Sequence, residues 1–142
     1  VIECEGWDRN LYLDQTTAPW GMPSPNMPTI DTAVVYPGGC LFEATNLSEG
    51  RGTTRPFEIV GAPFLNGERW AKDLQEYQLE GVVFRPLEFQ PTFNKHAGKV
   101  CSGVFLHVTD RSVFKPVLTA FAMIHAAIRQ TGVHQVEGVH LD

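Results

Sequence analysis

Apolar and polar positions in the last two thirds of the chain follow strand and helix periods in turn. Residues 58–60 and 82–89 have the pattern of short strands, and residues 100–109 that of a longer one. Residues 66–77 and 113–130 carry apolar side chains at helical spacing. This order predicts an α+β fold, an α/β two-layer arrangement whose βαββα core packs helices on a small mixed sheet.

Single residues indicate where these elements begin and how they lie. Asn66 and Ser112 are suited to cap the two helices, because their side chains accept hydrogen bonds from free backbone N–H groups. Pro86 lacks a backbone donor, so we expect its strand at an edge of the sheet or with a bulge. The last helix has its apolar residues at helical spacing, namely Val117, Leu118, Phe121, Ile124 and Ile128.

The first part of the chain is irregular. Four prolines lie between residues 16 and 28, and each restricts its own backbone and that of the preceding residue, which predicts a stiff, Pro-rich arm. Thr29 is suited to start a helix that residues 37–39, Pro-Gly-Gly, end. We therefore divide the chain into an arm with a polar loop, residues 1–56, and a compact α/β subdomain, residues 57–142.

Length and composition limit the functional classes. A chain of 142 residues suffices for one compact domain with a core, and 43% hydrophobic residues fit a globular protein. The net charge of -5 and the scattered lysines and arginines argue against a nucleic-acid partner. No apolar run approaches the roughly 18 residues that span a bilayer. The chain begins with Val1 and has no signal-peptide pattern, so we expect a piece of a longer protein.

Cysteines and histidines do not form a recognisable metal or disulfide pattern. Cys4, Cys40 and Cys101 are odd in number and far apart, which favours free buried thiols over a disulfide or a metal site. His107 lies in an alternating strand and His125 in an apolar helical run, without a carboxylate or thiol at ligand spacing. We predict no metal and no cofactor.

Residues 43–56 form a polar stretch with one large apolar residue, Leu47. The stretch holds two carboxylates, two guanidiniums, an amide, four hydroxyls and two glycines. It is either a solvated loop or the wall of a polar pocket. Apolar segments at residues 40–42 and 57–60 tie both ends to the core, so we expect the stretch to be held in place.

The paired carboxylates of this stretch, Glu43 and Glu49, are the minimum equipment for acid/base cleavage of a glycosidic bond. The alternative is that they form structural salt bridges with Arg51 and Arg55. Those arginines and the glycine-rich backbone are also suited to bind a carboxylate or phosphate. Trp20 in the arm is either a stacking platform for a sugar or an anchor to the core. Motifs of common hydrolases, zinc proteases and phosphate-binding loops are absent.

Several unusual strings resemble the signature of the NamZ-type exo-β-N-acetylmuramidases, many of which were long grouped as a bacterial domain of unknown function. The chain departs from the usual pattern at Ala44, where glycine is expected. The matching strings are GWDR (6–9), WGMPSPNMP (20–28), YPG (36–38), EATNLSEGRGTTRPF (43–57) and GAP (61–63), with weaker matches at FRP (84–86) and HVTDR (107–111).

The resemblance implies an enzyme that removes N-acetylmuramic acid from the non-reducing ends of peptidoglycan fragments. Such enzymes have a Rossmann-like N-terminal domain and a smaller C-terminal α/β domain, with the active site between them. This chain resembles the linking segment and most of the smaller domain. The general-acid glutamate is expected in the N-terminal domain, so we expect the fragment alone to be inactive. We also expect a secreted or periplasmic bacterial protein.

The expected partners are therefore muropeptides or peptidoglycan fragments and the missing N-terminal domain of the same protein. The alternative is a non-catalytic module that binds the cell wall or an acidic carbohydrate. Catalytic residues stay unassigned, with Glu43 and Glu49 as weak candidates. The expected substrate-binding residues are Trp20, Ser24, Asn26, Asn46, Ser48, Arg51, Thr53 and Arg55.

Overall fold

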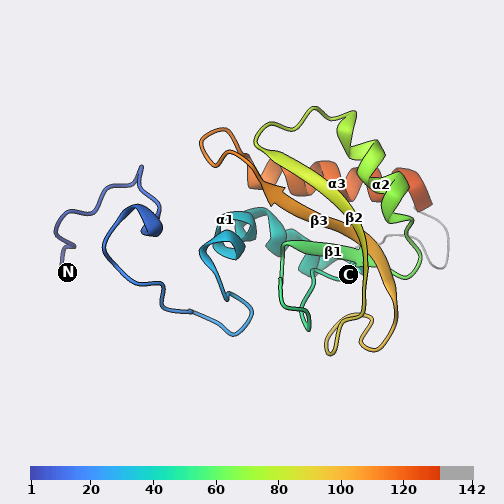
Figure 1. Ribbon diagram of the computed structural model, residues 1–142, viewed down its shortest axis with the longest axis horizontal. Coiled ribbons are helices and arrows are strands. Elements are labelled where there is room, and N and C mark those ends of the chain that lie inside the picture. Colours follow the sequence, from blue (N-terminus) through green and yellow to red (C-terminus); the bar gives the residue numbers. More distant parts are fainter. Residues whose placement is uncertain (132–142) are drawn as a thin grey trace.

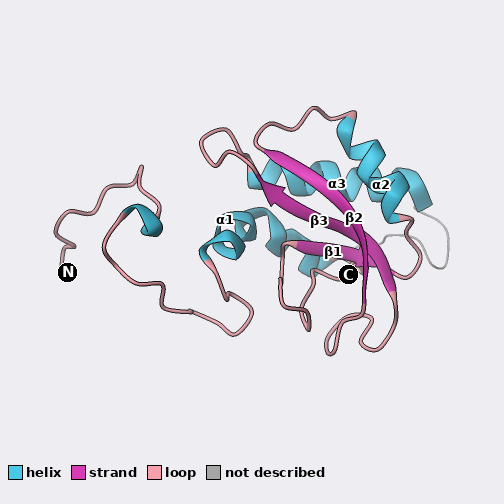
Figure 2. Ribbon diagram, in the orientation of Figure 1, coloured by secondary structure: helices cyan, strands magenta, loops and turns pink. Residues whose placement is uncertain are grey.

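A three-stranded sheet with helices packed against it forms the body of the chain (Figure 1). The computed structural model describes residues 1–131, and the predicted end of the subdomain, residues 132–142, lies outside them. Helices and strands follow one another from residue 59 in the predicted order, which confirms the α+β fold and its βαββα core (Figure 2). The elements are α1 (Ile30–Gly39), β1 (Ile59–Ala62), α2 (Gly67–Gln75), β2 (Val82–Phe89), β3 (Cys101–Val108) and α3 (Pro116–Thr131), with short 3-10 helices at Leu13–Gln15 and Cys40–Ala44.

The described sheet is antiparallel, in the order β1-β3-β2, so the predicted mixed sheet is wrong in this respect. β1 and β2 run in the same direction, as a crossover through α2 requires. However, β3 inserts between them and pairs antiparallel with both. Pro86 therefore lies in an edge strand of the described sheet, which confirms its predicted position.

The core lies on one face of the sheet, between the strands and α2 and α3. Val60 and Val104 are cross-strand partners, and both are fully buried on this face. Trp70 of α2 is also fully buried, and its indole N–H donates to the carbonyl oxygen of Met123 in α3 at 3.1 Å. Asn66 caps α2 as predicted, because its side chain accepts from the backbone N–H of Arg69 at 2.9 Å.

The start and the buried face of α3 differ from the prediction. The helix begins at Pro116, and Ser112 does not cap it. Instead, the backbone N–H and the hydroxyl of Ser112 donate to Asp110 at 2.8 and 2.6 Å. The predicted apolar positions Val117, Leu118 and Phe121 are 45–60% exposed, whereas the fully or nearly fully buried residues are Ala120, Met123, Ala126 and Ala127. Small side chains allow α1 and α3 to approach closely. This close packing, rather than the hydrophobicity of single side chains, decides which face of α3 is buried.

The first helix, α1, continues further than predicted. Thr29 caps it, accepting from Thr32 N–H at 3.2 Å, but the helix runs through Pro37 to Gly39. Packing explains the extension, because a Cβ atom on Gly38 would lie 2.0 Å from the carbonyl oxygen of Pro116. The helix therefore needs glycine at this crossing, and the tertiary contact overrides the local helix-breaking tendency.

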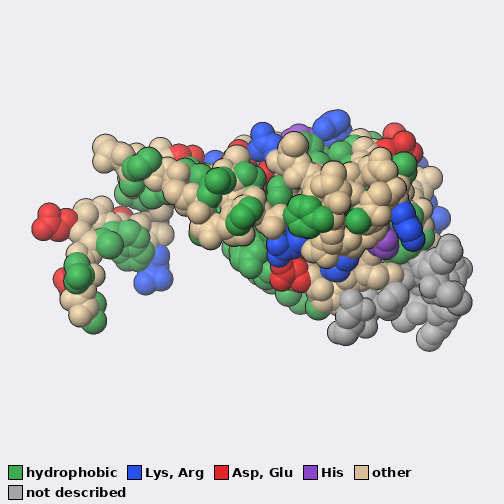
Figure 3. Space-filling view, turned by 90° about the horizontal axis from the view of Figure 1, so that it is seen from below, with side chains coloured by type: hydrophobic (Ala, Val, Ile, Leu, Met, Phe, Trp, Pro, Cys, Tyr) green, Lys and Arg blue, Asp and Glu red, His purple; other side chains and the backbone are tan. Residues whose placement is uncertain are grey.

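Residues 1–29 form the arm, which extends away from the body (Figures 1 and 3). It is irregular apart from one 3-10 turn, as the prolines predict. Arg111, which follows β3, holds it through an ion pair with Asp14 at 2.6 Å and a contact with the Tyr12 ring, 5.2 Å from the centroid. Residues 30–56, by contrast, share the core of the body through Val34, Val35, Phe42 and Leu47.

All three cysteines are free, as predicted, but they are not all buried. Cys101 is buried, Cys40 is partly buried and Cys4 is exposed in the arm. Burial raises the pKa of the Cys101 thiol to about 11, so this thiol stays protonated. No described helix has the length and hydrophobicity required to cross a membrane.

Candidate functional site

Backbone contacts fix the polar loop, residues 43–56, against the sheet. Ser48 forms a bridge with Gly61 of β1, with N–O distances of 2.8 and 3.0 Å. The N–H of Phe57 donates to the carbonyl oxygen of Glu49 at 2.6 Å, which closes the loop. Gly50 has a φ of 76°, and a Cβ atom there would lie 2.4 Å from the carbonyl oxygen of Ile59, so this turn requires glycine. The expectation that the loop is held in place is met at the level of its backbone.

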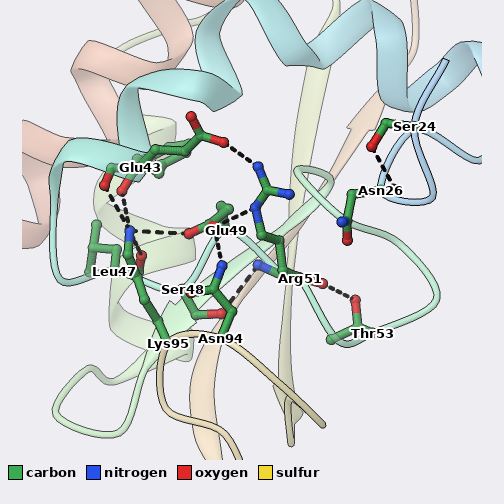
Figure 4. A network of polar contacts seen from close by, with 12 residues as sticks. Ser24, Asn26, Glu43, Leu47, Ser48, Glu49, Arg51, Thr53, Asn94 and Lys95 are labelled. Atoms are coloured by element: carbon green, nitrogen blue, oxygen red, sulfur yellow. Dashed lines mark hydrogen bonds and ion pairs between the residues drawn. The ribbon is translucent and has the colours of Figure 1, made fainter.

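A network of opposite charges joins this loop to the loop between β2 and β3 (Figure 4). Glu49 is 1% exposed, and its carboxylate accepts from Arg51 Nε at 2.9 Å and from Asn94 Nδ2 at 3.3 Å. Lys95 Nζ lies 3.2 Å from its other oxygen. A second nitrogen of Arg51 binds Glu43. Burial lowers the pKa of Arg51, but the hydrogen bonds and charges of the two glutamates outweigh it and raise the pKa above its usual value.

Lys95 joins the loop between β2 and β3 to the polar loop. Its ammonium group donates to the carbonyl oxygens of Phe42, Glu43 and Leu47 at 2.8, 3.2 and 3.3 Å. These carbonyls lie at the end of a 3-10 helix and in the following turn, and that of Phe42 also accepts from the N–H and hydroxyl of Thr45 at 3.0 and 2.9 Å. His96 binds the carbonyl oxygen of Asn46 at 2.7 Å. Nothing in the sequence pattern indicated this role, because the partners lie about 50 residues apart.

The geometry favours the salt-bridge alternative for Glu43 and Glu49. Both carboxylates bind Arg51, and Glu49 is enclosed among its partners. Arg51 is therefore occupied and offers few free donors to a ligand. Ser48 is 2% exposed, and its hydroxyl oxygen accepts from the N–H of Gly50 at 3.2 Å. The structure brings these residues together, but their polar groups bind mostly to one another. They therefore support the polar loop and leave few groups for a ligand.

The other predicted binding residues lie outside this network of charges. Thr53 donates its hydroxyl to the carbonyl oxygen of Gly50 at 2.6 Å. Ser24 and Asn26 lie on the arm, joined by a hydrogen bond of 3.3 Å to the Ser24 hydroxyl, and Figure 4 draws no contact from them to Arg51. Asn46 is partly buried in the polar loop.

Trp20 is partly buried in the arm. Its indole N–H is buried and has no hydrogen-bond partner among residues 1–131. Stacking of a sugar on this ring stays a prediction.

Arg55 lies in different surroundings from Arg51. Its side chain is 41% exposed, and its nearest carboxylate oxygen, Glu58 Oε2, is 3.6 Å from Nη1. Glu58 is buried, and its other oxygen accepts the hydroxyl of Thr32 at 2.8 Å. Burial raises the pKa of Glu58, although Thr32 and Arg55 oppose the effect. Glu58 was predicted as part of a strand and was not assigned to the site. The available signal was a carboxylate at the start of an apolar strand, three residues after an arginine.

A pocket of about 330 Å³ adjoins Arg55 and Glu58. His107 of β3 lines it, and Arg85 Nε donates to His107 Nε2 at 3.4 Å. Burial and the charges of Arg85 and Arg55 lower the pKa of His107, so the ring is neutral at pH 7. Within residues 1–131, no three acidic, histidine or cysteine side chains gather in a way that suits a metal ion. The pocket is lined by Asp31, Val35, Arg55, Glu58, Phe105, Leu106, His107 and Val108.

Comparisons with known sequences connect this geometry to one family. A family profile described as "Exo-beta-N-acetylmuramidase NamZ, C-terminal" matches residues 34–139, which include the polar loop and all residues that line the pocket except Asp31. A relative from Bacillus subtilis (strain 168), named peptidoglycan beta-N-acetylmuramidase NamZ, is 48% identical over 124 residues. The match covers 87% of this chain and 30% of the relative.

Comparison with solved structures also finds relatives of this chain. A DUF1343 family protein from Bacteroides fragilis NCTC 9343 superposes with a TM-score of 0.82 at 27% identity, over 87% of this chain and 33% of that protein. A second DUF1343 protein from the same organism superposes with a TM-score of 0.56 at 25% identity, over 82% of this chain and 30% of that protein. The chain thus spans about a third of the length of the relatives it matches.

Proposed function

The chain belongs to the family of NamZ exo-β-N-acetylmuramidase C-terminal domains, and from this premise we propose that its full-length protein is a peptidoglycan-degrading glycoside hydrolase. The proposed reaction removes N-acetylmuramic acid from the non-reducing ends of cell-wall fragments. The observation that carries the proposal is the 48% identity to a relative named for that activity. At this identity the two chains share their fold, and the region matched by the family profile includes the residues that line the pocket except Asp31.

In this proposal the chain supplies the substrate-binding half of a cleft. The other half is a Rossmann-like N-terminal domain, which carries the general acid. The geometry supports this division, because Glu43 and Glu49 are tied to Arg51 and do not offer a free acid/base pair. We propose that the 142 residues alone do not cleave the glycosidic bond. The division of the chain at residue 56 stays a prediction.

The site and location follow from the proposed substrate. N-acetylmuramic acid bears a lactyl carboxylate, which an arginine binds well. Of the two arginines in the polar loop, Arg55 is the one with free donors, so we assign it the contact with the substrate anion. A cell-wall substrate also fits a secreted or periplasmic protein.

The test is hydrolysis of the disaccharide N-acetylmuramyl-β-1,4-N-acetylglucosamine by the full-length protein, followed by chromatography. We expect release of free N-acetylmuramic acid by the full-length protein and none by residues 1–142 alone. If the full-length protein binds the disaccharide in calorimetry but leaves it intact, the hydrolase proposal fails and a non-catalytic binding module takes its place.

A further inference from the structure

Two arginines lie beside the rings of Phe105 and His107, on the face of the sheet opposite to the core. Phe105 of β3 lies in register between Ile59 of β1 and Arg85 of β2. Phe105 and His107 alternate along the strand and share this face, with ring centroids 4.1 Å apart. The guanidinium carbon of Arg85 lies 5.5 Å from the Phe105 ring centroid. Arg55 reaches the same place from the polar loop and lines the pocket with both rings.

Neither guanidinium is bound by a carboxylate in the way that Arg51 is. Arg85 forms no ion pair within residues 1–131, and its one polar contact is the 3.4 Å hydrogen bond to His107. Arg55 stands 3.6 Å from Glu58, whereas hydrogen-bonded charge pairs usually lie at about 2.7–2.9 Å. Arg85 contacts the His107 ring, and Arg55 lines the same pocket as this ring.

Glu58 orients Arg55 rather than neutralising the pocket. Its carboxylate is buried, and Thr32 holds one oxygen while the other faces Arg55 Nη1. The backbone N–H of Arg55 donates to the Thr53 hydroxyl, whereas the other guanidinium nitrogens of Arg55 have no hydrogen-bond partner in the described part of the chain. Asp31, the second carboxylate at the pocket, is paired with Arg111 at 2.9 Å. The unsatisfied donors at this place are therefore those of Arg55, which lines the pocket, and of Arg85, which contacts the lining residues Phe105 and His107.

We infer that Arg55, Arg85 and His107 form a carboxylate subsite above Phe105, which binds the carboxylate of an acidic sugar. This inference rests on the proposed function for the identity of the sugar, N-acetylmuramic acid. The pocket volume of about 330 Å³ lies at the lower end of the range typical of small-ligand sites. His107 accepts from Arg85 at Nε2, which leaves the proton on Nδ1 as a further donor.

The test is a calorimetric titration of the full-length protein with N-acetylmuramic acid and with N-acetylglucosamine. The two sugars differ by the lactyl group, so the ratio of their dissociation constants isolates the recognition of the carboxylate. We expect the acidic sugar to bind at least about tenfold more tightly, and Arg85→Met to reduce this ratio by about tenfold. Arg69→Met removes an exposed arginine of α2 that pairs with Asp73, so it serves as the matched control and leaves the ratio unchanged.

Arg55→Met gives a second reading of the same site, and thermal unfolding checks that the variant is folded. We expect the same loss of preference, with partial recovery in Arg55→Lys. The inference is overturned if both variants weaken the two sugars equally or leave the ratio unchanged. Inorganic phosphate is the third probe, and tighter binding of phosphate than of N-acetylmuramic acid overturns the assignment to a sugar acid.

Failure of this inference is distinguishable from failure of the proposed function. Hydrolysis of the disaccharide by the unmodified protein decides the function. The ratio of dissociation constants decides the subsite, whether or not the bond is cleaved.

Discussion

At the scale of single residues, Arg51 and Arg55 lie four positions apart in the polar loop but have different partners. Arg51 binds two carboxylates and lies over the Phe57 ring, 5.0 Å from its centroid. Arg55 has one loosely placed carboxylate, Glu58, and a pocket beside it. Both residues are equivalent in the sequence pattern. Only their tertiary surroundings separate a structural arginine from one that is available to a ligand.

Glu58, the partner of Arg55, makes the free energy of unfolding depend on pH. Because burial raises its pKa, the folded state holds the Glu58 proton more tightly than the unfolded chain does. The stabilising contribution is thus present below the unfolded pKa and is lost as the pH rises through the folded pKa. In Glu58→Gln this loss is absent. We expect the free energy of unfolding of the variant, relative to wild type, to increase from about pH 4 to about pH 7.

Urea titrations at several pH values measure this difference. A relative free energy that stays constant, or that moves in favour of wild type as the pH rises, contradicts the account of Glu58 as a buried carboxyl with a raised pKa.

At the scale of elements, the loop between β2 and β3 supports the polar loop through one side chain. Lys95 contacts three carbonyl oxygens and the buried carboxylate of Glu49. Lys95→Met leaves that carboxylate with one cation fewer and the three carbonyls without this donor. We expect the free energy of unfolding to fall by about 2–4 kcal/mol. Lys99→Met, an exposed lysine of the same loop, serves as the control with an expected change within about 0.5 kcal/mol.

Chemical denaturation of both variants tests this support. Equal stability of the Lys95 and Lys99 variants shows that the ammonium group does not hold the two loops together.

The contact between β1 and β3 depends on a pair of glycines. Gly61 and Gly103 face each other across the strands, and a Cβ atom on Gly103 would lie 2.1 Å from the carbonyl oxygen of Val60. Gly103→Ala therefore forces β1 to move, and we expect it to lower the free energy of unfolding by about 1–3 kcal/mol or more. Gly21→Ala in the arm has open space around the added methyl group and is expected to change stability by less than about 0.5 kcal/mol.

Thermal unfolding followed by circular dichroism compares the two alanine variants. If both alanine variants unfold at the wild-type temperature, the added methyl group at residue 103 is tolerated. The pairing of Gly61 with Gly103 across β1 and β3 is then incorrect.

Local patterns predicted the elements well, and tertiary packing decided the rest. Caps at Thr29 and Asn66 and the edge position of Pro86 were predictable, because each depends on a residue's own hydrogen-bonding groups. The extension of α1 through Pro37 was not, since it depends on contact with α3. The buried face of α3 was also missed, because its alanines pack closely while larger residues such as Phe121 remain exposed.

The candidate site was predictable in part. The polar loop and its arginines were identified from composition, and the substrate class that we propose came from the family resemblance. Glu58, Arg85 and His107 were not assigned, because Glu58 precedes β1, Arg85 lies in β2 and His107 in β3, and the pocket forms only where α1, residues 55–58 and β3 pack together.

At the scale of the whole molecule, the chain is one part of a larger enzyme in our account. It spans about a third of the length of the relatives it matches, and its own carboxylate pair, Glu43 and Glu49, forms ion pairs with Arg51. We propose that the pocket around Arg55 and the arm with Trp20 face the substrate, and that the catalytic acid comes from the other domain.

The most direct test of this division is a crystal structure of the full-length protein with N-acetylmuramic acid bound. We predict that the sugar lies in a cleft between the two domains, with its lactyl carboxylate within hydrogen-bonding distance of Arg55. A sugar bound entirely by the other domain, with Arg55 and His107 facing solvent, would contradict the account.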